Sequence, residues 1–407
     1  MSTFERKNRS LRAAATGRPP CGHTCRLHQG ADCSKITGNN GVTLSRPFRA
    51  GRAGEPGDIA RGAIALKRSW KRQYAEKLVT AIEALSHIRN GQTIIIGSGA
   101  GEPLLLTQTL AETGRRFCDI EVIHLTSARG DSPLASRELA DSFRYNTFFI
   151  GRHGARSTDG VFTDFTPMNL SELPAAMAGG VIVVDVALVQ VSPPDPLGLC
   201  SLGVSVDATK AAVENAKIVI AQVNEQMPIT VGDTMVPADA IDYMVEGNAP
   251  LIEVAPPELD PISLTIGRHV ASLIGDGTTL HFDRGPISAA TMRYLDTRKD
   301  LGIHTDILTD DLLRLIESGA VTNRKKRINR GKSVATMAMG SRRLYDRLVG
   351  TPYIELLPID QVTSPRIISL NDNAVAVLSV EEMELTGLAR SDTEDVLVNR
   401  SLLSTID

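Results

Sequence analysis

Nearly continuous runs of apolar residues, separated by helix-like segments, constrain the fold of this 407-residue chain more than any other feature. Strands that are apolar on both faces must be covered on both faces, and this favours a mostly parallel sheet with helices on either side. The strand-like runs lie at 93–96, 120–125, 147–150, 181–191 and 218–223, and the helix-like segments at 70–88, 104–112, 170–178 and 208–216. The sequence therefore predicts an α/β protein.

The alternation is repeated in the second half of the chain, with strand-like runs at 277–282, 334–337, 367–370 and 374–378. Between the halves, residues 237–261 are rich in loop-forming residues such as Pro250, Pro256 and Pro257, and we place a domain boundary there. A chain of 407 residues is long enough for about two domains. We therefore predict two open, mostly parallel-sheet domains, at 68–250 and 258–407.

Residues 1–67 differ from the rest of the chain because they are rich in Arg, Gly and Pro and poor in acidic residues. Such a composition buries too little apolar surface to offset the entropy of ordering, and it predicts a disordered tail. An organelle-targeting segment and translated upstream sequence without function are two other interpretations. The spacing of Cys21, Cys25 and Cys33 matches no standard zinc pattern, so no metal site is predicted.

The composition is that of an ordinary soluble globular protein, with 42% apolar and 22% charged residues. A formal charge of −3 gives no reason to expect nucleic acid or a membrane surface as a partner. No apolar run approaches the length of about 20 residues that spans a bilayer, and no secretory signal follows the first basic residues. Cys118 and Cys200 lie in apolar surroundings, which predicts buried thiols in a reducing compartment. We therefore expect a cytoplasmic protein.

Polar residues that follow a strand make 263–318 the first candidate for a functional site. The predicted strand 277–282 leads into the turn Asp283-Arg284-Gly285-Pro286 and a helix at 288–298. A short loop then presents His304, Thr305 and Asp306 before a second helix at 311–317. A strand that leads into a turn and a helix is where α/β sheets usually place their chemistry.

A glycine-rich turn after the strand 93–96 is the second candidate, and it reads GSGAGEP from Gly97 to Pro103. Glycine lets the backbone approach a ligand or a neighbouring strand closely, so Gly99 and Glu102 are candidate site residues. Close strand-to-helix packing explains the turn equally well. A dinucleotide-binding fingerprint would need glycine at 102, where Glu102 stands, and we reject that interpretation.

These segments together resemble the acetyl-CoA hydrolase/transferase family, which includes 4-hydroxybutyrate, acetate and succinate CoA-transferases. In that family a strand leads into a GIGAIP-like turn, a helix and the motif G-[IV]-H-T-E, whose Glu is the nucleophile. The resemblance covers about 70–392. Its motifs here are Arg156 and Gly160 followed by FTPMNLSELP at 165–174, DVALVQVSPPD at 185–195, GLCSLGV at 198–204 and AQVNEQMP at 221–228.

The resemblance implies two α/β domains of the CoA-transferase (family I) type, with acyl-CoA and a small carboxylic acid as partners. Asp306 would be the nucleophile, and the turn formed by Asp283, Arg284, Gly285, Pro286 and Ile287 would contact CoA and donate N–H groups to the oxyanion. CoA would be a substrate, and no cofactor or metal is implied. A homo-oligomer is also expected from the resemblance.

Three departures from the family pattern bear on activity. Asp306 is one methylene shorter than the family's Glu, and a misplacement of about 1 Å can cost about 100-fold in rate. The turn reads DRGPIS from Asp283 to Ser288, so Pro286 removes a backbone donor and Asp283 adds a negative charge. The chain also ends soon after the segment ELTG at 384–387, without the glycine-rich segments that follow in the family, and 396–407 matches nothing in the family.

Each candidate residue has a structural alternative. Asp306 could cap a helix that begins near Leu308, His304 could be a packed loop histidine, and Glu102 could be an ordinary first-turn acid. The basic run 324–327 could contact CoA phosphates or nucleic acid, although a solvated loop is the commoner explanation. The sequence thus predicts a CoA-transferase, with an acyl-CoA hydrolase or a non-catalytic homologue that binds a partner as the alternatives.

Overall fold

The computed structural model describes residues 70–129, 132–148 and 163–379, together with 382–383, 385 and 389–390. Several features of the sequence lie outside the described residues: the predicted tail 1–67, Arg156, Gly160, most of 384–387 and the segment 396–407. Among the described helices, none combines the length and the apolar character needed to cross a bilayer.

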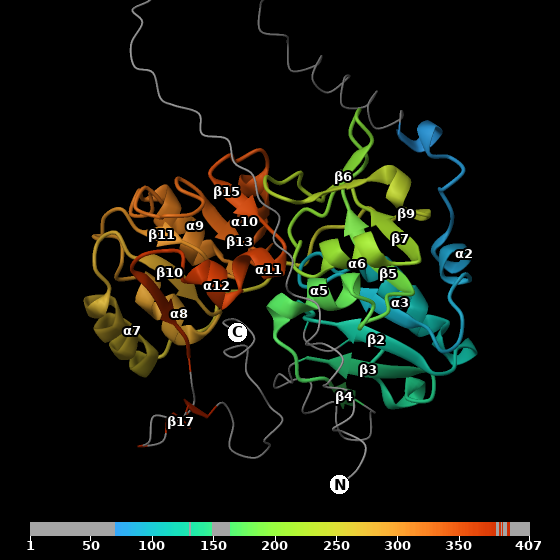
Figure 1. The fold of residues 1–407 in the computed structure, drawn as a ribbon, viewed down its shortest axis with the longest axis horizontal. Helices are drawn as coiled ribbons and strands as arrows, with labels where there is room; N and C mark the ends of the chain where they lie inside the picture. Colours follow the sequence, from blue (N-terminus) through green and yellow to red (C-terminus); the bar gives the residue numbers. More distant parts are fainter. Residues whose placement is uncertain are drawn as a thin grey trace, which may run out of the picture. The chain divides into compact units, whose positions relative to one another are not determined.

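The first sheet has seven parallel strands in the order β4-β3-β2-β1-β5-β7-β9 (Figure 1). The strand order reverses between β1 and β5, which is where doubly wound sheets open a crevice at the carboxyl ends of their strands. The strands are β1 (Thr93–Ile96), β2 (Ile120–His124), β3 (Phe143–Thr147), β4 (Thr163–Phe165), β5 (Val186–Val191), β7 (Ile218–Val223) and β9 (Tyr243–Glu246).

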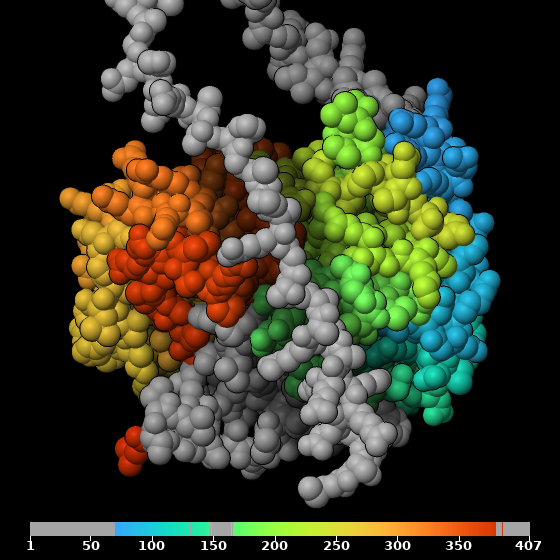
Figure 2. Space-filling model, in the orientation of Figure 1, coloured from blue at the N-terminus to red at the C-terminus, as the bar shows by residue number. Residues whose placement is uncertain are grey.

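Both faces of the first sheet are covered, and alternate residues of one strand enter different cores. Ile94 and Ile96 of β1 pack with Leu106 and Leu110 of α3, whereas Ile95 belongs to the core on the other face. The space-filling view in Figure 2 shows one face of the molecule, where the segments of the first sheet, in green and yellow, pack closely. The helices near this sheet are α2 (Ala81–Leu85), α3 (Leu104–Glu112), α5 (Leu173–Ala178) and α6 (Thr209–Asn215). Outside the seven strands, β6 (Leu199–Ser201) pairs with β8 (Met235–Pro237) in antiparallel orientation.

The second group of strands, which we call the second sheet, is also parallel but is interrupted. Strand β10 (Thr279–Phe282) lies between β11 (Gly302–Ile303) and β16 (Ala374–Val377). A single bridge between His304 and Val334 joins β11 to β13, which pairs with β15. Beyond the interruption, β12 pairs with β14. These last strands are β12 (Ile307–Leu308), β13 (Ser333–Ala335), β14 (Met337–Ala338) and β15 (Ile354–Leu356), and β17 (Glu382–Met383) pairs with β18 (Ala389–Arg390).

Helices follow the strands of the second sheet as the α/β pattern predicts. The longest, α7 (Pro261–Leu273), begins at Asp260, whose side chain accepts a hydrogen bond from Ser263 N at 2.6 Å and so caps the helix. Helix α7 packs against α8 (Pro286–Met292). The others are α9 (Asp310–Glu317), α10 (Arg342–Leu348), α11 (Ile359–Val362) and α12 (Pro365–Ile368).

Backbone hydrogen bonds join the loops of the first sheet directly to strands of the second. Val206 N donates to Thr336 O at 3.0 Å, and Ala338 N donates to Val204 O at 2.8 Å. Both acceptor–donor pairs lie beside the interruption of the second sheet. The two sheets are therefore connected through main-chain groups at the position where the sequence places its candidate residues.

The predicted elements agree with the structure where an apolar run is long and isolated. Strands β1 and β7 and helix α3 have the predicted bounds. The predicted helix 70–88 is wrong in its middle, because Val79 N and Lys77 O hydrogen-bond to the backbone of Met244, which extends the chain there. Thr80 then caps the short helix α2, in which Ile82 is 59% exposed.

Four other predictions are corrected by the structure. The strand expected at 147–150 is β3, which begins four residues earlier. No strand forms at the start of 367–370, because these residues end helix α12, which begins at Pro365, and proline favours the first position of a helix. Strand β9 lies within the stretch predicted to be loop-rich. Cys118 is exposed rather than buried, because it lies in the turn before β2, where its N–H donates to Asn90 Oδ1 at 3.0 Å.

Candidate active site

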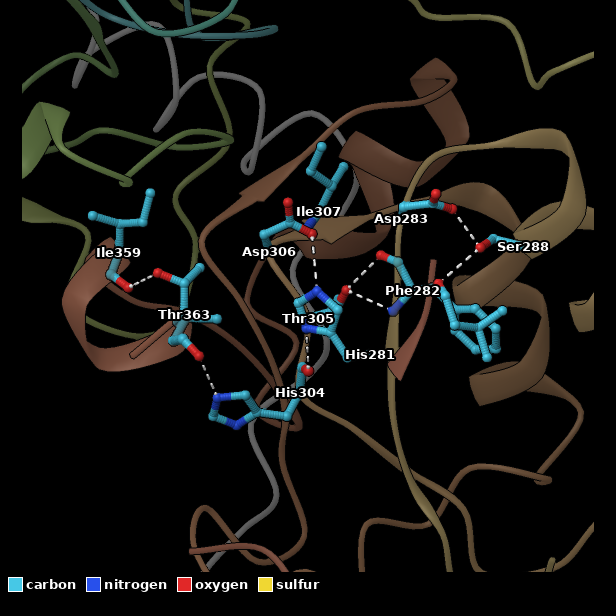
Figure 3. A network of polar contacts seen from close by, with 12 residues as sticks. His281, Phe282, Asp283, Ser288, His304, Thr305, Asp306, Ile307, Ile359 and Thr363 are labelled. Carbon is cyan, nitrogen blue, oxygen red and sulfur yellow. Dashed lines mark hydrogen bonds and ion pairs between the residues drawn. The ribbon is translucent and has the colours of Figure 1, made fainter. Parts of the chain in front are cut away.

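Asp306 lies in the interruption between β11 and β12, and its backbone is held from both sides. Its carbonyl oxygen accepts hydrogen bonds from Thr336 N at 2.9 Å and Met337 N at 3.0 Å. Its own Oδ1 accepts from Ile307 N at 2.8 Å. Its side chain stays 17% exposed. The residue therefore presents a partly accessible carboxylate from a fixed backbone (Figure 3).

The helix-capping interpretation of Asp306 is wrong. Helix α9 begins at Asp310, and its N-cap residue is Thr309, three positions after Asp306. The carboxylate of Asp310 accepts hydrogen bonds from Ser341 N and Ser341 Oγ, so it also has a separate structural partner. Asp306 thus owes its position to the strand interruption and not to a helix start.

Thr305 closes the gap that the interruption leaves in the ladder. Its hydroxyl donates to Phe282 O at 3.0 Å and accepts from Phe282 N at 3.3 Å, so one side chain replaces two backbone hydrogen bonds. Thr305 is fully buried, and its hydroxyl leaves neither Phe282 N nor Phe282 O without a hydrogen-bond partner. The strand can therefore bend at Asp306 without detaching from β10.

The electrostatic surroundings of Asp306 favour its neutral form when no partner charge is present. Burial raises the pKa of the Asp306 carboxyl, and the nearby Asp283 raises it further. His281 opposes this effect, with its Nε2 4.0 Å from Asp306 Oδ1. A carboxylate that water solvates poorly is a stronger nucleophile once it is ionised, which suits attack on an acyl group.

The turn after β10 is built around the side chain of Asp283, which points into the protein. Its carboxylate accepts hydrogen bonds from Ser379 N at 2.6 Å, Gly285 N at 3.0 Å and the hydroxyl of Ser288 (Figure 3). The Gly285 N–H is therefore occupied, Pro286 has none, and Asp283 N donates to Val377 O at 3.3 Å. Of the five predicted turn residues, only Arg284 and Ile287 keep an N–H that a substrate oxyanion could use.

His304 does not face Asp306 and is the packed loop histidine that the sequence allowed as an alternative. The His304 ring is buried and its Nε2 lies 2.8 Å from Val362 O at the end of α11, away from Asp306 (Figure 3). Burial, with Lys326 nearby, lowers the pKa of His304 to about 4. The histidine beside the carboxylate is His281 of β10, which lies inside an apolar run of the sequence and was not predicted to have a functional role. A polar residue near the carboxyl end of a predicted parallel strand was the signal that could have revealed it.

The glycine-rich turn lies at the reversal of the first sheet and reaches the strand next to Asp306. Gly99 has φ +59°, and a side chain there would place its Cβ 3.3 Å from Met337 Sδ. Met337 belongs to β14 and pairs with Ile307, the residue that follows Asp306. The structure therefore brings close together a turn and a carboxylate, Asp306, that lie about 200 positions apart in the sequence.

Glu102 is buried at the carboxyl ends of β1 and β2. Its Oε2 accepts a hydrogen bond from Ser127 Oγ at 2.8 Å and lies 3.9 Å from His124 Nε2. Burial lowers the pKa of His124. Helix α3 begins at Leu104 and has no acidic residue in its first turn, so Glu102 is not the first-turn acid that the sequence allowed. Its role in an acyl pocket stays a prediction.

A pocket open to solvent, with a volume of about 340 Å³, borders the turn after β10. Arg284 and Gly285 line it on one side, and the loop 254–257 and the start of α9 line it on the other. Arg284 is half-buried, and burial lowers the pKa of its guanidinium, whose Nη2 donates to Ala255 O at 3.3 Å. Asp306 is not among the lining residues.

The basic run 324–327 is only partly the solvated loop that the sequence predicts. Arg324, Lys325 and Arg327 are exposed, but Lys326 is buried and its Nζ donates to Ile303 O and Lys332 O, both at 2.8 Å. Burial lowers the pKa of Lys326 to about 7. Among the described residues, no group of three or more His, Cys, Asp or Glu side chains is arranged to hold a metal ion.

The fold and the site together define an α/β protein of two parallel sheets, with a partly buried carboxylate beside the contact between them. Comparison with known families identifies it further, because residues 64–256 match the acetyl-CoA hydrolase/transferase N-terminal domain and residues 340–400 match the C-terminal domain. The chain belongs to the acetyl-CoA hydrolase/transferase family.

Individual relatives agree with this assignment. The chain is 38% identical to the 4-hydroxybutyrate coenzyme A transferase of Clostridium kluyveri over 324 residues, which cover 80% of this chain and 75% of that protein. It is 33% identical to a succinyl-CoA:acetate/propanoyl-CoA:succinate CoA transferase of Fasciola hepatica, covering 76% of this chain and 65% of that one. The crystal structure of 4-hydroxybutyrate CoA-transferase from Porphyromonas gingivalis has a TM-score of 0.70 at 34% identity, covering 79% and 77%. RipA from Yersinia pestis has a TM-score of 0.75 at 32% identity, covering 80% and 76%.

Proposed function

We propose that the protein transfers CoA between an acyl-CoA and a small carboxylate, with Asp306 as the nucleophile. The observation that carries this proposal is the position of Asp306: a partly exposed, poorly solvated carboxylate on a backbone fixed by Thr336, Met337 and Ile307. The named relatives in the family, which are CoA-transferases, support the reaction class.

The first half of the reaction would use Asp306 twice. One carboxylate oxygen attacks the thioester carbonyl, the carbon–sulfur bond breaks, and the products are an acyl–Asp306 anhydride and CoA thiolate. The thiolate then attacks the side-chain carbonyl carbon of Asp306, and the C–O bond between this carbon and the bridging oxygen breaks. The donor carboxylate departs, and an Asp306–CoA thioester remains. An acceptor carboxylate reverses these steps. In this scheme the turn N–H groups of Arg284 and Ile287 would donate hydrogen bonds to the oxyanions.

Intact-mass analysis of the protein incubated with acetyl-CoA and a panel of carboxylates tests the proposal. We expect a covalent CoA adduct on the wild type and none on Asp306→Ala, with CoA transferred to the accepting carboxylate and acetate released. A wild type that forms no adduct and turns over no substrate, like Asp306→Ala, would contradict the proposal and favour a non-catalytic homologue. Release of free CoA without any acceptor would instead identify a hydrolase.

The acyl group, the acceptor, the homo-oligomeric state and the cytoplasmic location stay predictions. The panel of carboxylates addresses the acceptor directly, because the rate of adduct discharge can be compared among them. Light scattering of the purified chain addresses the oligomeric state.

A further inference from the structure

His281 occupies an unusual position for a histidine in the middle of a buried parallel strand. It is 3% exposed, and its Nδ1 lies 3.2 Å from His304 O. A carbonyl oxygen can only accept a hydrogen bond, so Nδ1 must carry the proton of that contact. In the neutral ring Nε2 then has a lone pair and no proton. Within the described residues Nε2 has no hydrogen-bond partner.

The carboxylate of the proposed nucleophile lies close to this nitrogen. His281 Nε2 lies 4.0 Å from Asp306 Oδ1, and a relative shift of about 1 Å would bring the two atoms within hydrogen-bonding distance. Asp306 Oδ1 accepts a hydrogen bond from Ile307 N at 2.8 Å, and the side chain is 17% exposed, so rotation about its side-chain bonds can change this separation. A buried proton acceptor thus faces a partly buried acid.

From this geometry we infer that His281 is the positioning residue that accepts the proton of Asp306 and keeps the carboxylate ionised for attack. In that step the Asp306 O–H bond breaks, the proton forms a bond to His281 Nε2, and an imidazolium–carboxylate pair remains. His281 does not contact the substrate in this role. The inference rests on the proposed function, because an ionised Asp306 matters only if Asp306 is the nucleophile.

The other charged groups around the pair act in opposite directions. Asp283, in the turn after β10, favours a proton on the pair. Lys326 lies beyond His304 and disfavours a positive charge on that ring. The described strands β13 and β16, which flank β11 and β10, contribute no ionisable side chain. Burial raises the pKa of Asp306 and lowers the pKa of His281, so the mutual attraction of the two groups decides where the proton resides.

Two substitutions separate the proton-accepting role from simple packing. His281→Asn places its amide nitrogen near the position of Nδ1, so it can keep the bond to His304 O while it removes Nε2. His281→Gln places a polar nitrogen near the position of Nε2 but loses the Nδ1 donor. Neither amide can accept a proton at neutral pH. If His281 only packs, the two variants should differ in stability and agree with the wild type in their pH dependence.

The first experiment measures the rate of CoA-adduct formation by quenched intact-mass analysis between pH 5 and 9. We expect both variants to approach the wild-type rate at pH 9. As the pH falls, their rates should decline at a higher pH than the wild-type rate does. At pH 6 they should be about ten-fold slower than the wild type, which is the effect of raising the pKa of Asp306 by one unit. An acidic limb in His281→Asn that coincides with the wild-type limb would overturn the inference. A wild type without any adduct would contradict the proposed function.

The second experiment needs no turnover and therefore distinguishes the two failures. In protein labelled with 15N-histidine, the His281 signal is assigned by its absence from His281→Asn. We expect the Nδ1–H tautomer in the neutral ring and a lower His281 pKa in Asp306→Asn than in the wild type, because the partner charge is lost. An Nε2–H tautomer, or a His281 pKa that Asp306→Asn leaves unchanged, would refute the inference whether or not the protein is active.

Discussion

The two sheets of this protein share a parallel architecture but differ in continuity. The first sheet pairs all seven strands without interruption, and alternate residues of β1 enter two separate cores. The second sheet breaks near Asp306, where β11 ends, β12 begins and a single bridge joins β11 to β13. The proposed nucleophile stands in the broken ladder, not in the continuous one.

The difference shows what an interrupted ladder requires of side chains. In the first sheet, backbone groups of neighbouring strands bond to one another along a ladder that is not interrupted. At the break, Thr305 replaces two backbone bonds, Asp283 holds the neighbouring turn, and Lys326 connects Ile303 to Lys332. Polar side chains that would be costly in an ordinary core here hold the segment that presents Asp306.

The largest effect that we expect on stability concerns Lys326 and pH. Its pKa is about 7 in the folded protein and near 10.4 in an unfolded chain, so between these values the unfolded state binds more protons and stability rises with pH. Between pH 7 and 9.5 this amounts to on the order of 3–4 kcal/mol. Urea unfolding at both pH values measures it, and Lys326→Met, which cannot titrate, should lose that dependence. Equal pH dependence in the two proteins would show that Lys326 stays charged when folded.

The next largest effect concerns Asp283, which can be compared with Asp195 in the first half of the chain. Asp283→Ala leaves the Gly285 and Ser379 N–H groups without their buried acceptor, and we expect a loss of about 3 kcal/mol. Asp195 also accepts two backbone N–H groups, from Leu197 and Leu199, but in a partly exposed hairpin where water can replace it. Asp195→Ala should therefore cost about 1 kcal/mol. Similar losses in the two variants, measured by urea unfolding, would contradict the view that the broken sheet depends more on its side chains.

The same contrast explains how much of the molecule the sequence could predict. Strands β1 and β7 and helix α3 follow from local apolar patterns, and their bounds were predicted. The extended segment before α2 depends on a bridge from Leu78 to Met244 of β9, more than 160 positions away, and local periodicity does not contain such a contact. The order of residues around Asp306 was visible as a motif. That His281, and not His304, faces Asp306 depends on how β10 and β11 pair, and only the structure reveals it.

The smallest effect concerns the contact between the two sheets at Gly99. Its φ of +59° costs a side chain about 1–2 kcal/mol, and a Cβ would also lie 3.3 Å from Met337 Sδ. Gly91 is a matched control, because its φ is +75° but a Cβ there would meet nothing within 4 Å.

We expect Gly91→Ala to show the backbone cost alone, and Gly99→Ala to exceed it by about 0.5–1 kcal/mol in urea unfolding, because Met337 must move in a packed interior. Met337 pairs with Ile307, so the same movement reaches the residue after Asp306 and should slow CoA-adduct formation several-fold. Gly91→Ala should leave that rate unchanged. If Gly99→Ala also matched the wild-type rate, the glycine-rich turn would connect the sheets without influencing the geometry of the proposed nucleophile.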